Sequence, residues 1–239
     1  MSQASTCSKP VPFIQGKVDC IHEAFSACQC RSFADLGGVW GVNGYYTFYT
    51  LDHFPIDQAY LVDIHIYDEV KNRAKQYPEL TLVETSFHQH ILSGEVRPVD
   101  CLFLFDVLLH QVSPDWREIL RLYVPFTSHF LIYNPQYRIT PHTVRLPELG
   151  KKKYFRQVPV AQNKHDINLL FDQPDEKLDK TGLLRKNFGV YWQWGITDGD
   201  LISHMQELGF YLQWTKDCGK FPGTRAFNGV AFLFSQHAH

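Results

Sequence analysis

The sequence is short of the features that would assign the chain to several large classes of protein. It has no run of the roughly 20 apolar residues that a membrane-spanning helix needs, and its N-terminus has no apolar stretch of signal-peptide length. The formal net charge is only −2, so nothing indicates a general attraction to nucleic acid or to an anionic membrane. We therefore expect a soluble, cytoplasmic protein that binds neither of them.

Cysteine and histidine patterns typical of metal sites are also missing. Cys28 and Cys30 are too close for an ordinary disulfide, and no second cysteine pair is present to complete a zinc site. Cys101 lies within an apolar run, the usual place for a reduced core cysteine. His88 and His90 would need a third ligand, and none is nearby in the sequence. We expect a reducing environment and no metal.

What is present is a chain of 239 residues with 44% apolar and 15% aromatic residues, enough to bury the core of one α/β domain. Short apolar runs predict strands, and segments with helical spacing lie between them. The most continuous apolar run, 99–105, is typical of a central parallel strand covered on both faces. The expected strands are 32–36, 60–65, 80–83, 99–105 and 130–133, followed by an antiparallel pair at 210–214 and 230–234.

The helices are predicted from periodicity and end signals. We expect one helix to start with Ser113 as N-cap and Pro114 at the first helical position. Another should start at Thr197 and end before Gly209. The remaining expected helices are 13–25, 43–53 and 68–77. Strands that alternate with helices predict a doubly wound, mostly parallel α/β sheet with right-handed crossovers.

Residues 134–195 break this alternation, because they are rich in Pro, Lys, Gln and Asp. A structureless connection of that length is unusual in a compact domain. We interpret it as an insertion with some helix of its own, within a single domain that spans residues 1–239, and expect it to cover the active site.

The stretch that follows the first expected strand is the most informative. Asp35 precedes a group of glycines, which let the backbone take a positive φ and let a ligand approach closely. A strand that runs into glycines and then a helix is how α/β folds place backbone N–H groups against a cofactor. Asp35, Gly37 and Gly41 resemble motif I of the class I S-adenosylmethionine-dependent methyltransferases. Val39 takes the place of the middle glycine of that motif, and Gly38 is an additional glycine beside it.

The resemblance implies a seven-stranded, Rossmann-like fold with an antiparallel last strand and an insertion after strand 5. It covers roughly residues 30–133 and 197–235, and implies S-adenosylmethionine as cofactor. Asp63 falls where the family has an acid that binds both ribose hydroxyls, and a carboxylate with two oxygens suits such a diol. Ile64 would lie on the adenine. Ser86 and Phe87 fall near the adenine amino group, where the family often has Asp.

The segment after the fourth expected strand also resembles the small-molecule methyltransferases, which often have an acid, two or three apolar residues and a histidine there. Asp106 would lie beside the methionine part of the cofactor. His110 is the candidate general base, because its unperturbed pKa is near 6.5. The alternative is a histidine that only orients the loop by a backbone hydrogen bond.

Aromatic and basic residues of the insertion are the candidates for acceptor binding. They are Tyr137, Arg138, Tyr191, Trp192 and Trp194. The three aromatics at 191–194 either form a wall of the acceptor pocket or pack the insertion onto the sheet.

The function expected from this resemblance is methyl transfer from S-adenosylmethionine to oxygen or nitrogen of a small-molecule acceptor. One alternative is a binding protein that keeps the fold but has lost cofactor or catalysis, which Val39 and Ser86 would favour. Another is an NAD-type oxidoreductase, because Asp63 would serve ribose equally well. That class needs a Gly-x-Gly-x-x-Gly turn, which residues 37–44 do not give in register. The oligomeric state stays open, a homodimer included.

Overall fold

The structure is a computed structural model that describes residues 13–159, 164–178 and 182–236. The chain divides into two compact units, Met1–Phe103 and Leu104–His239. Whether they act as a single domain stays a prediction.

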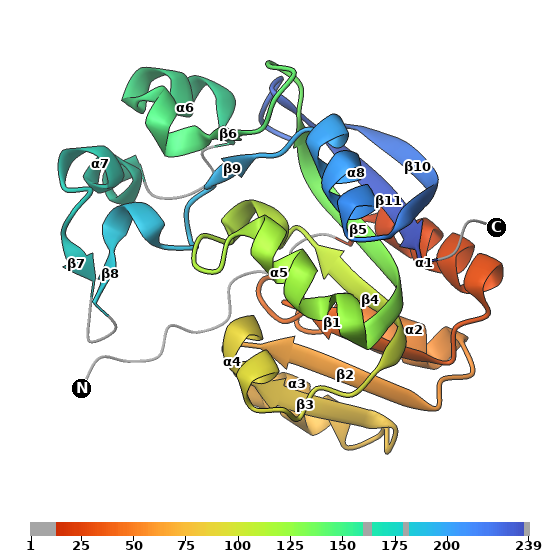
Figure 1. The fold of residues 1–239 in the computed structure, drawn as a ribbon. Helices are drawn as coiled ribbons and strands as arrows, with labels where there is room; N and C mark the ends of the chain where they lie inside the picture. The colour runs from red at the N-terminus through yellow and green to blue at the C-terminus, as the bar shows by residue number, and fades with distance from the viewer. Residues whose placement is uncertain (1–12, 160–163, 179–181, 237–239) are drawn as a thin grey trace. The chain divides into compact units, whose positions relative to one another are not determined.

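One mixed sheet of seven strands has the order β10-β11-β5-β4-β1-β2-β3 (Figure 1). β1 is parallel to β2 and β4, and β2 is parallel to β3. β11 is antiparallel to both β5 and β10. This order confirms the expected α/β class and the antiparallel last strand. The bounds are β1 (Ser32–Leu36), β2 (Gln58–Asp63), β3 (Leu80–Glu84), β4 (Val99–Phe105), β5 (Thr127–Tyr137), β10 (Tyr211–Lys220) and β11 (Phe227–Ser235).

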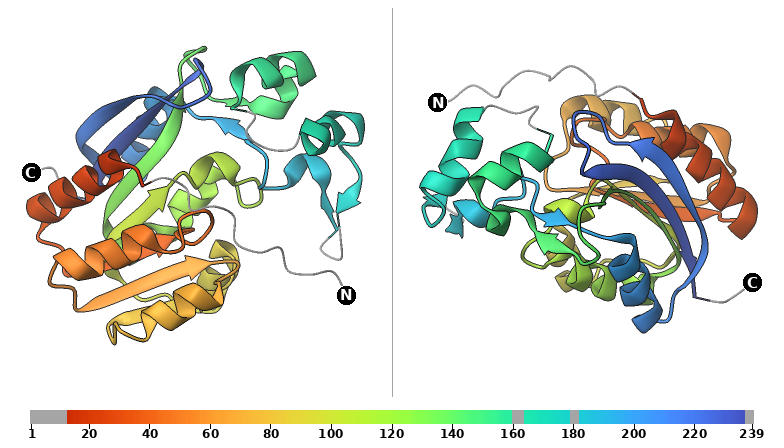
Figure 2. Two further views of the ribbon diagram at one scale, coloured as in Figure 1. Left: turned by 180° about the vertical axis from the view of Figure 1, so that it is seen from behind. Right: turned by 90° about the horizontal axis from the view of Figure 1, so that it is seen from above.

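The first unit joins parallel strands by helices, as the alternation predicted. α2 (Tyr45–His53) begins two residues later than expected, because Asn43 and Gly44 have positive φ angles of 49° and 71°. Figure 2 shows α1 and α2 along one face of the strands of this unit. α4 was not predicted, since its six residues are too few for a clear period. The other helices are α1 (Gln15–Cys28), α3 (Asp68–Ala74) and α4 (Phe87–Leu92).

Aromatic packing holds the strands and α1 of this unit together. Phe33 of β1 and Phe103 of β4 are fully buried, and their rings stack with centroids 4.9 Å apart. Phe25 of α1 contacts both rings edge-on. Burying one such side chain stabilises the fold by roughly 1.5–3 kcal/mol. Leu36, also fully buried at the end of β1, continues this core to the glycine turn.

The second unit contains α5 (Trp116–Tyr123) and α8 (Asp198–Glu207). The expected cap of α8 is confirmed, since Thr197 accepts a hydrogen bond from the Asp200 N–H. The expected start of α5 at Ser113 and Pro114 is wrong. The N-cap is Asp115, whose carboxylate accepts hydrogen bonds from the backbone N–H groups of Arg117 and Glu118, both at 2.9 Å. A carboxylate that satisfies two helix-end donors is a stronger cap than a serine hydroxyl two residues earlier.

β5 is longer than predicted, because it continues through Asn134 to Tyr137 along β11. The following segment has short elements and packs around Leu146, Tyr154 and Ile167 in a core that Tyr137 of β5 and Phe227 of β11 share. These elements are β6 (Val144–Arg145), η3 (Leu146–Leu149), α6 (Lys151–Gln157), α7 (Lys164–Asp172), β7 (Lys177–Leu178), β8 (Leu183–Leu184), η4 (Arg185–Asn187) and β9 (Trp194–Gly195). β6 pairs with β9, and β7 with β8. In the described residues, no helix is long and apolar enough to cross a membrane.

The N-cap of α5 can be tested by substitution. Asp115→Ala should lower the free energy of unfolding by about 1 kcal/mol, because two backbone donors lose their acceptor. Asp115→Asn keeps an acceptor oxygen and should stay within a few tenths of a kcal/mol of the wild type. Urea unfolding followed by circular dichroism measures both. Equal losses for Ala and Asn would show that the cap is not what the helix depends on.

Candidate functional site

The glycine turn after β1 has the backbone that the motif requires. Gly37 and Gly41 have φ angles of 82° and 76°, a region that side chains disfavour. The Gly37 N–H donates to the Val62 carbonyl at 2.8 Å, which joins the turn to β2. Val39 has a negative φ and a fully buried side chain, so a residue other than glycine fits this position. The backbone therefore accommodates the departure from motif I at Val39.

Asp35 lies beneath this turn and is only 1% exposed. The Thr47 hydroxyl of α2 donates to Asp35 Oδ2 at 2.6 Å. Burial raises the pKa of Asp35 to about 6, against the opposing effects of the Thr47 hydrogen bond and the Lys17 charge. Asp35 Oδ1 has no hydrogen-bond partner among the residues that the structure describes. A buried oxygen of this kind calls for a donor, and an ammonium group would be one.

Gly38 is explained by the same carboxylate. A Cβ at this position would lie 2.2 Å from Asp35 Oδ2 and 2.5 Å from its Cγ. Because Asp35 is short, buried and held by Thr47, it cannot move aside at little cost. Gly38 is therefore a glycine because the Asp35 carboxylate occupies the space that a Cβ would need.

Asp63 is the last residue of β2, two residues before the end of the strand expected at 60–65, and is 6% exposed. Its Oδ2 accepts a hydrogen bond from the Val39 N–H at 3.0 Å. Burial raises the pKa of Asp63, whereas hydrogen bonds from the backbone of Val39, His65, Trp40 and Ile64 pull it back. The carboxylate is therefore oriented by the glycine turn.

The residues expected at the adenine lie on two loops of the same unit. Ile64 follows Asp63 and is 73% exposed, so its side chain is available for contact. Ser86 is the N-cap of α4, and its hydroxyl accepts a hydrogen bond from the Gln89 N–H at 3.2 Å. Phe87 follows as the first, half-buried residue of that helix.

Sequence reasoning missed two residues next to Asp35. Thr47 is buried and donates to it, and a hydroxyl one turn into the helix after a glycine turn could have indicated this. Lys17 of α1 is 3% exposed, and its ammonium lies 5.1 Å from the centroid of the Tyr46 ring. Lys17 could have been noticed in the sequence as a basic residue on the apolar face of α1, four residues before Ile21.

The second unit holds the residues predicted after β4. Asp106 is half-buried with a φ of 57°, and η1 (Leu108–His110) follows. His110 Nδ1 lies 3.0 Å from the Tyr191 carbonyl oxygen, which assigns the proton to Nδ1 because a carbonyl only accepts. Burial lowers the pKa of His110, against the opposing effects of the Tyr191 and Gly189 carbonyls and the Asp106 charge. The imidazole is therefore neutral at pH 7.

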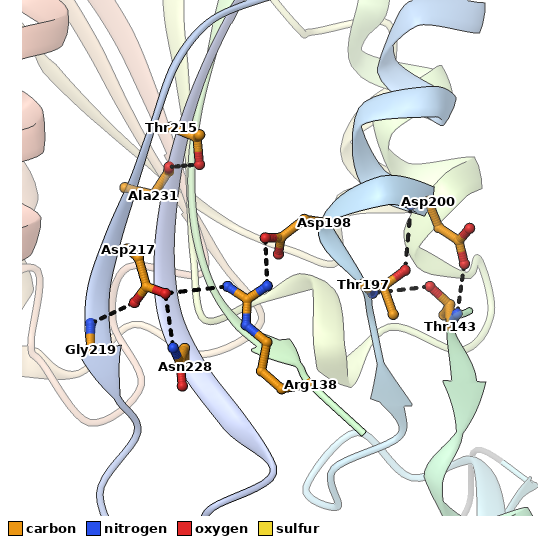
Figure 3. Close-up of polar contacts among 10 residues, drawn as sticks. All are labelled: Arg138, Thr143, Thr197, Asp198, Asp200, Thr215, Asp217, Gly219, Asn228 and Ala231. Carbon is orange, nitrogen blue, oxygen red and sulfur yellow. Dashed lines mark hydrogen bonds and ion pairs between the residues drawn. The ribbon is translucent and has the colours of Figure 1, made fainter. Parts of the chain in front are cut away.

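Tyr137 and Arg138 belong to β5 and the residue after it. Tyr137 is buried, and its hydroxyl donates to Gln157 Oε1 at 2.6 Å. Arg138 donates to Asp198 at 2.6 Å, and its other terminal nitrogen lies 3.6 Å from Asp217 (Figure 3). In this structure Arg138 joins α8 to β10, and these contacts occupy it.

The aromatic residues at 191–194 pack the insertion onto other parts of the second unit. Tyr191 is buried in the core of the insertion, and Trp192 contacts Phe227 of β11 edge-on at 5.0 Å. Trp194 Nε1 donates to the Gln111 carbonyl at 2.5 Å. These contacts are those expected of residues that pack the insertion, the second of the two roles considered from the sequence.

The structure thus assembles two groups, one in each unit. Asp35, Gly37, Gly38, Gly41 and Asp63 meet at the glycine turn, with Ile64 beside them in sequence. In the second unit, His110 meets Tyr191, and Trp194 meets the residue after His110.

The fold was compared with solved structures. A mitomycin 7-O-methyltransferase aligns with a TM-score of 0.57 and 13% identity over 93% of this chain, which spans only 53% of that protein. The 1,6-didemethyltoxoflavin-N1-methyltransferase of Burkholderia thailandensis, solved with S-adenosylhomocysteine, gives 0.60 and 12%, covering 93% of this chain and 78% of that one. The magnesium protoporphyrin IX methyltransferase of Synechocystis PCC 6803, solved with S-adenosylmethionine, gives 0.55 and 9%, covering 93% and 79%.

This chain has a class I methyltransferase fold. The sequence matches no protein-family model and no curated protein, so the likeness lies in the tertiary structure. The sheet has the features that the resemblance implied, namely seven mostly parallel strands with an antiparallel strand at one end.

The contact between Gly38 and Asp35 gives a first prediction for this site. Gly38→Ala should lower the free energy of unfolding by about 1–3 kcal/mol, because the new methyl overlaps a fixed carboxylate. Gly199→Ala in α8 is the matched control. Among the described residues, no atom outside its chain neighbours and its own helix backbone lies within 4 Å of the added Cβ, and a helical alanine should stabilise by about 0.5–1 kcal/mol. Similar changes for both variants in urea unfolding would contradict the contact.

A second prediction concerns pH. The folded-state pKa of Asp35 is about 6, above the ordinary value of 3.8, so the folded state binds this proton more tightly than the unfolded state does. Stability should therefore fall as pH rises from about 4 to about 6. Asp35→Asn removes this dependence. The unfolding free energy of the wild type should decline relative to Asp35→Asn by about 3 kcal/mol over this window. Parallel curves for the two proteins would refute the burial effect.

Proposed function

We propose that the chain is an S-adenosylmethionine-dependent methyltransferase that acts on oxygen or nitrogen of a small molecule. The observation that carries this proposal is the glycine turn held between β1 and β2 by Asp63, in a chain with this fold. The neighbours act on chemically different substrates, so their acceptors do not identify the acceptor of this chain.

The residues around the turn suit the parts of the cofactor. The bound cofactor would supply an electrophilic methyl group on a sulfonium. Asp63 would accept hydrogen bonds from the two ribose hydroxyls, with its carboxylate already oriented by Val39. The exposed Ile64 would lie on the adenine, and Phe87 would flank it. The N–H groups at Gly37, Gly38 and Gly41 and the Asp35 carboxylate would face the amino-acid end.

On the acceptor side, Asp106 would bound the methionine part, and His110 has two possible roles. As a general base it would take the proton of a hydroxyl or amine acceptor, for which a neutral imidazole is the required form. As a loop residue it would hold η1 through the Tyr191 carbonyl, a contact that the structure contains. The residues proposed to bind the acceptor remain Tyr137, Arg138, Tyr191, Trp192 and Trp194. Their role would be to hold the insertion in the shape that forms the acceptor site.

A binding protein with this fold but without turnover is the second candidate. Two contacts favour it, since the Ser86 hydroxyl caps α4 and the His110 ring is bound to the insertion. Such a protein would bind S-adenosylhomocysteine and transfer no methyl group to any acceptor. We place either version in the cytoplasm, where the thiols of Cys20, Cys28, Cys30, Cys101 and Cys218 would stay reduced.

The decisive test is binding of S-adenosylhomocysteine by isothermal titration. The wild type should bind with a micromolar or tighter constant. Asp63→Ala should weaken binding about tenfold to a hundredfold, because charge-assisted hydrogen bonds to ribose contribute roughly 1.5–3 kcal/mol. Asp63→Asn keeps an acceptor for the Val39 N–H. It therefore separates the effect on binding of losing the hydrogen bond to the turn from the effect of losing the carboxylate charge.

No heat and no thermal shift with millimolar cofactor would reject the proposal. An unchanged affinity in Asp63→Ala, with the protein folded, would place the ribose elsewhere.

A further inference from the structure

The first unit has a cavity on the helix side of the glycine turn. It measures about 210 Å³ and lies between α2, α3 and the residues before α1. The wall consists of Phe13, Val42, Asn43, Tyr45, Tyr46, Phe48, Glu69, Val70 and Arg73. Four of these nine residues are aromatic, and the only two with charged side chains have opposite signs. The proposed methyl transfer gives no role to the residues of this cavity.

The aromatic wall is held in place by contacts of its own. The Tyr46 hydroxyl accepts a hydrogen bond from the Ile14 N–H at 3.2 Å, which brings the preceding Phe13 over α2. The Phe13 and Tyr45 rings are tilted, with centroids 5.4 Å apart, and both side chains are exposed at the mouth. Phe48 is fully buried at the inner side. Such a wall suits the apolar or aromatic part of a ligand.

The two charged groups stand apart on the same helix. Glu69 and Arg73 have the i, i+4 spacing that favours an ion pair, but in this structure they turn to other partners. Glu69 Oε2 accepts a hydrogen bond from Asn43 Nδ2 at 3.3 Å. Arg73 lies over the Phe48 ring at 4.2 Å and contacts Asp52 at 3.5 Å. The exposed side chains of Glu69 and Arg73 thereby present a carboxylate and a guanidinium that are not paired with each other in this structure.

The backbone at the cavity positions the acid. Asn43 has a φ of 49°, a left-handed conformation that asparagine adopts more readily than most residues. Its side-chain amide donates to Glu69, so the end of the glycine turn orients this carboxylate.

We infer that this cavity binds an aromatic α-amino acid as its zwitterion. The ammonium would pair with Glu69, the carboxylate with Arg73, and the ring would lie against the exposed Phe13 and Tyr45. Both charged ends then form charge-assisted hydrogen bonds, and guanidinium is well suited to a carboxylate. A ligand with only one charge would form only one of these two charge-assisted contacts.

The cavity is distinct from the residues proposed to hold the cofactor. α2 turns Thr47 toward Asp35, whereas Tyr45 and Phe48 lie on the face toward the cavity. Successive helical residues point about 100° apart, so Thr47 faces Asp35 while the residues beside it in α2 line the cavity. The inference therefore goes beyond methyl transfer and does not depend on it.

Isothermal titration with L-phenylalanine, L-tyrosine and L-tryptophan tests the inference, in the presence of saturating S-adenosylhomocysteine. At least one should bind with a dissociation constant of about 1 mM or tighter, the range expected for a ligand of this size. N-acetylation or conversion to the methyl ester should each weaken binding tenfold or more. Glu69→Gln and Arg73→Gln should do the same. Glu95→Gln and Arg97→Gln, at exposed positions of this unit outside the cavity, are the matched controls.

Binding should persist in Asp63→Ala, which separates this inference from the fate of the cofactor site. The inference is overturned if no member of the panel binds at 10 mM, roughly ten times the expected constant. It is equally overturned if the blocked analogues bind as well as the free amino acids. Competition between S-adenosylhomocysteine and the amino acid would assign the cavity to the cofactor instead.

Discussion

The glycine turn depends on a buried carboxylate. Asp35 is removed from water, accepts a hydrogen bond from Thr47, and occupies the space that a Cβ on Gly38 would need. A charge in such a place destabilises the folded state when ionised, and the raised pKa expresses that cost. A binding site gains from the same arrangement, because a ligand donor that meets the unsatisfied oxygen recovers part of the loss. This one side chain explains the extra glycine of the turn and joins the turn to Thr47 of α2.

Asp63 connects this turn to the neighbouring strand. Its carboxylate accepts a hydrogen bond from the Val39 N–H. The Gly37 N–H donates to the carbonyl of Val62, the residue before Asp63 in β2. The turn is therefore fixed to β2 at two points, so the backbone N–H groups that would face a cofactor are preorganised. The second unit fixes its own candidate loop differently, since a backbone carbonyl of the insertion holds His110.

Much of the α/β architecture could be predicted because local signals agree with it. β1 and β4 have the predicted bounds, since each is a short apolar run with a clear end. Predictions were wrong where two local signals competed. Ser113 and Pro114 resemble a helix start, but Asp115 offers a carboxylate to two N–H groups and takes the cap. β5 extended beyond Tyr133 because β11 supplies partners along its whole length, which no local pattern records.

The sequence by itself determined the order of the seven strands of the main sheet, the glycine-rich turn that can take a positive φ, and the acid near the end of β2. These depend on backbone conformation and on hydrophobic pattern, which act over a few residues. Only the tertiary structure decided why Gly38 is glycine, why Val39 is tolerated, and which groups meet Asp35. It also decided that Glu69 and Arg73 face a cavity rather than each other. Those answers depend on burial and on contacts between residues far apart in the chain, and a linear pattern contains neither.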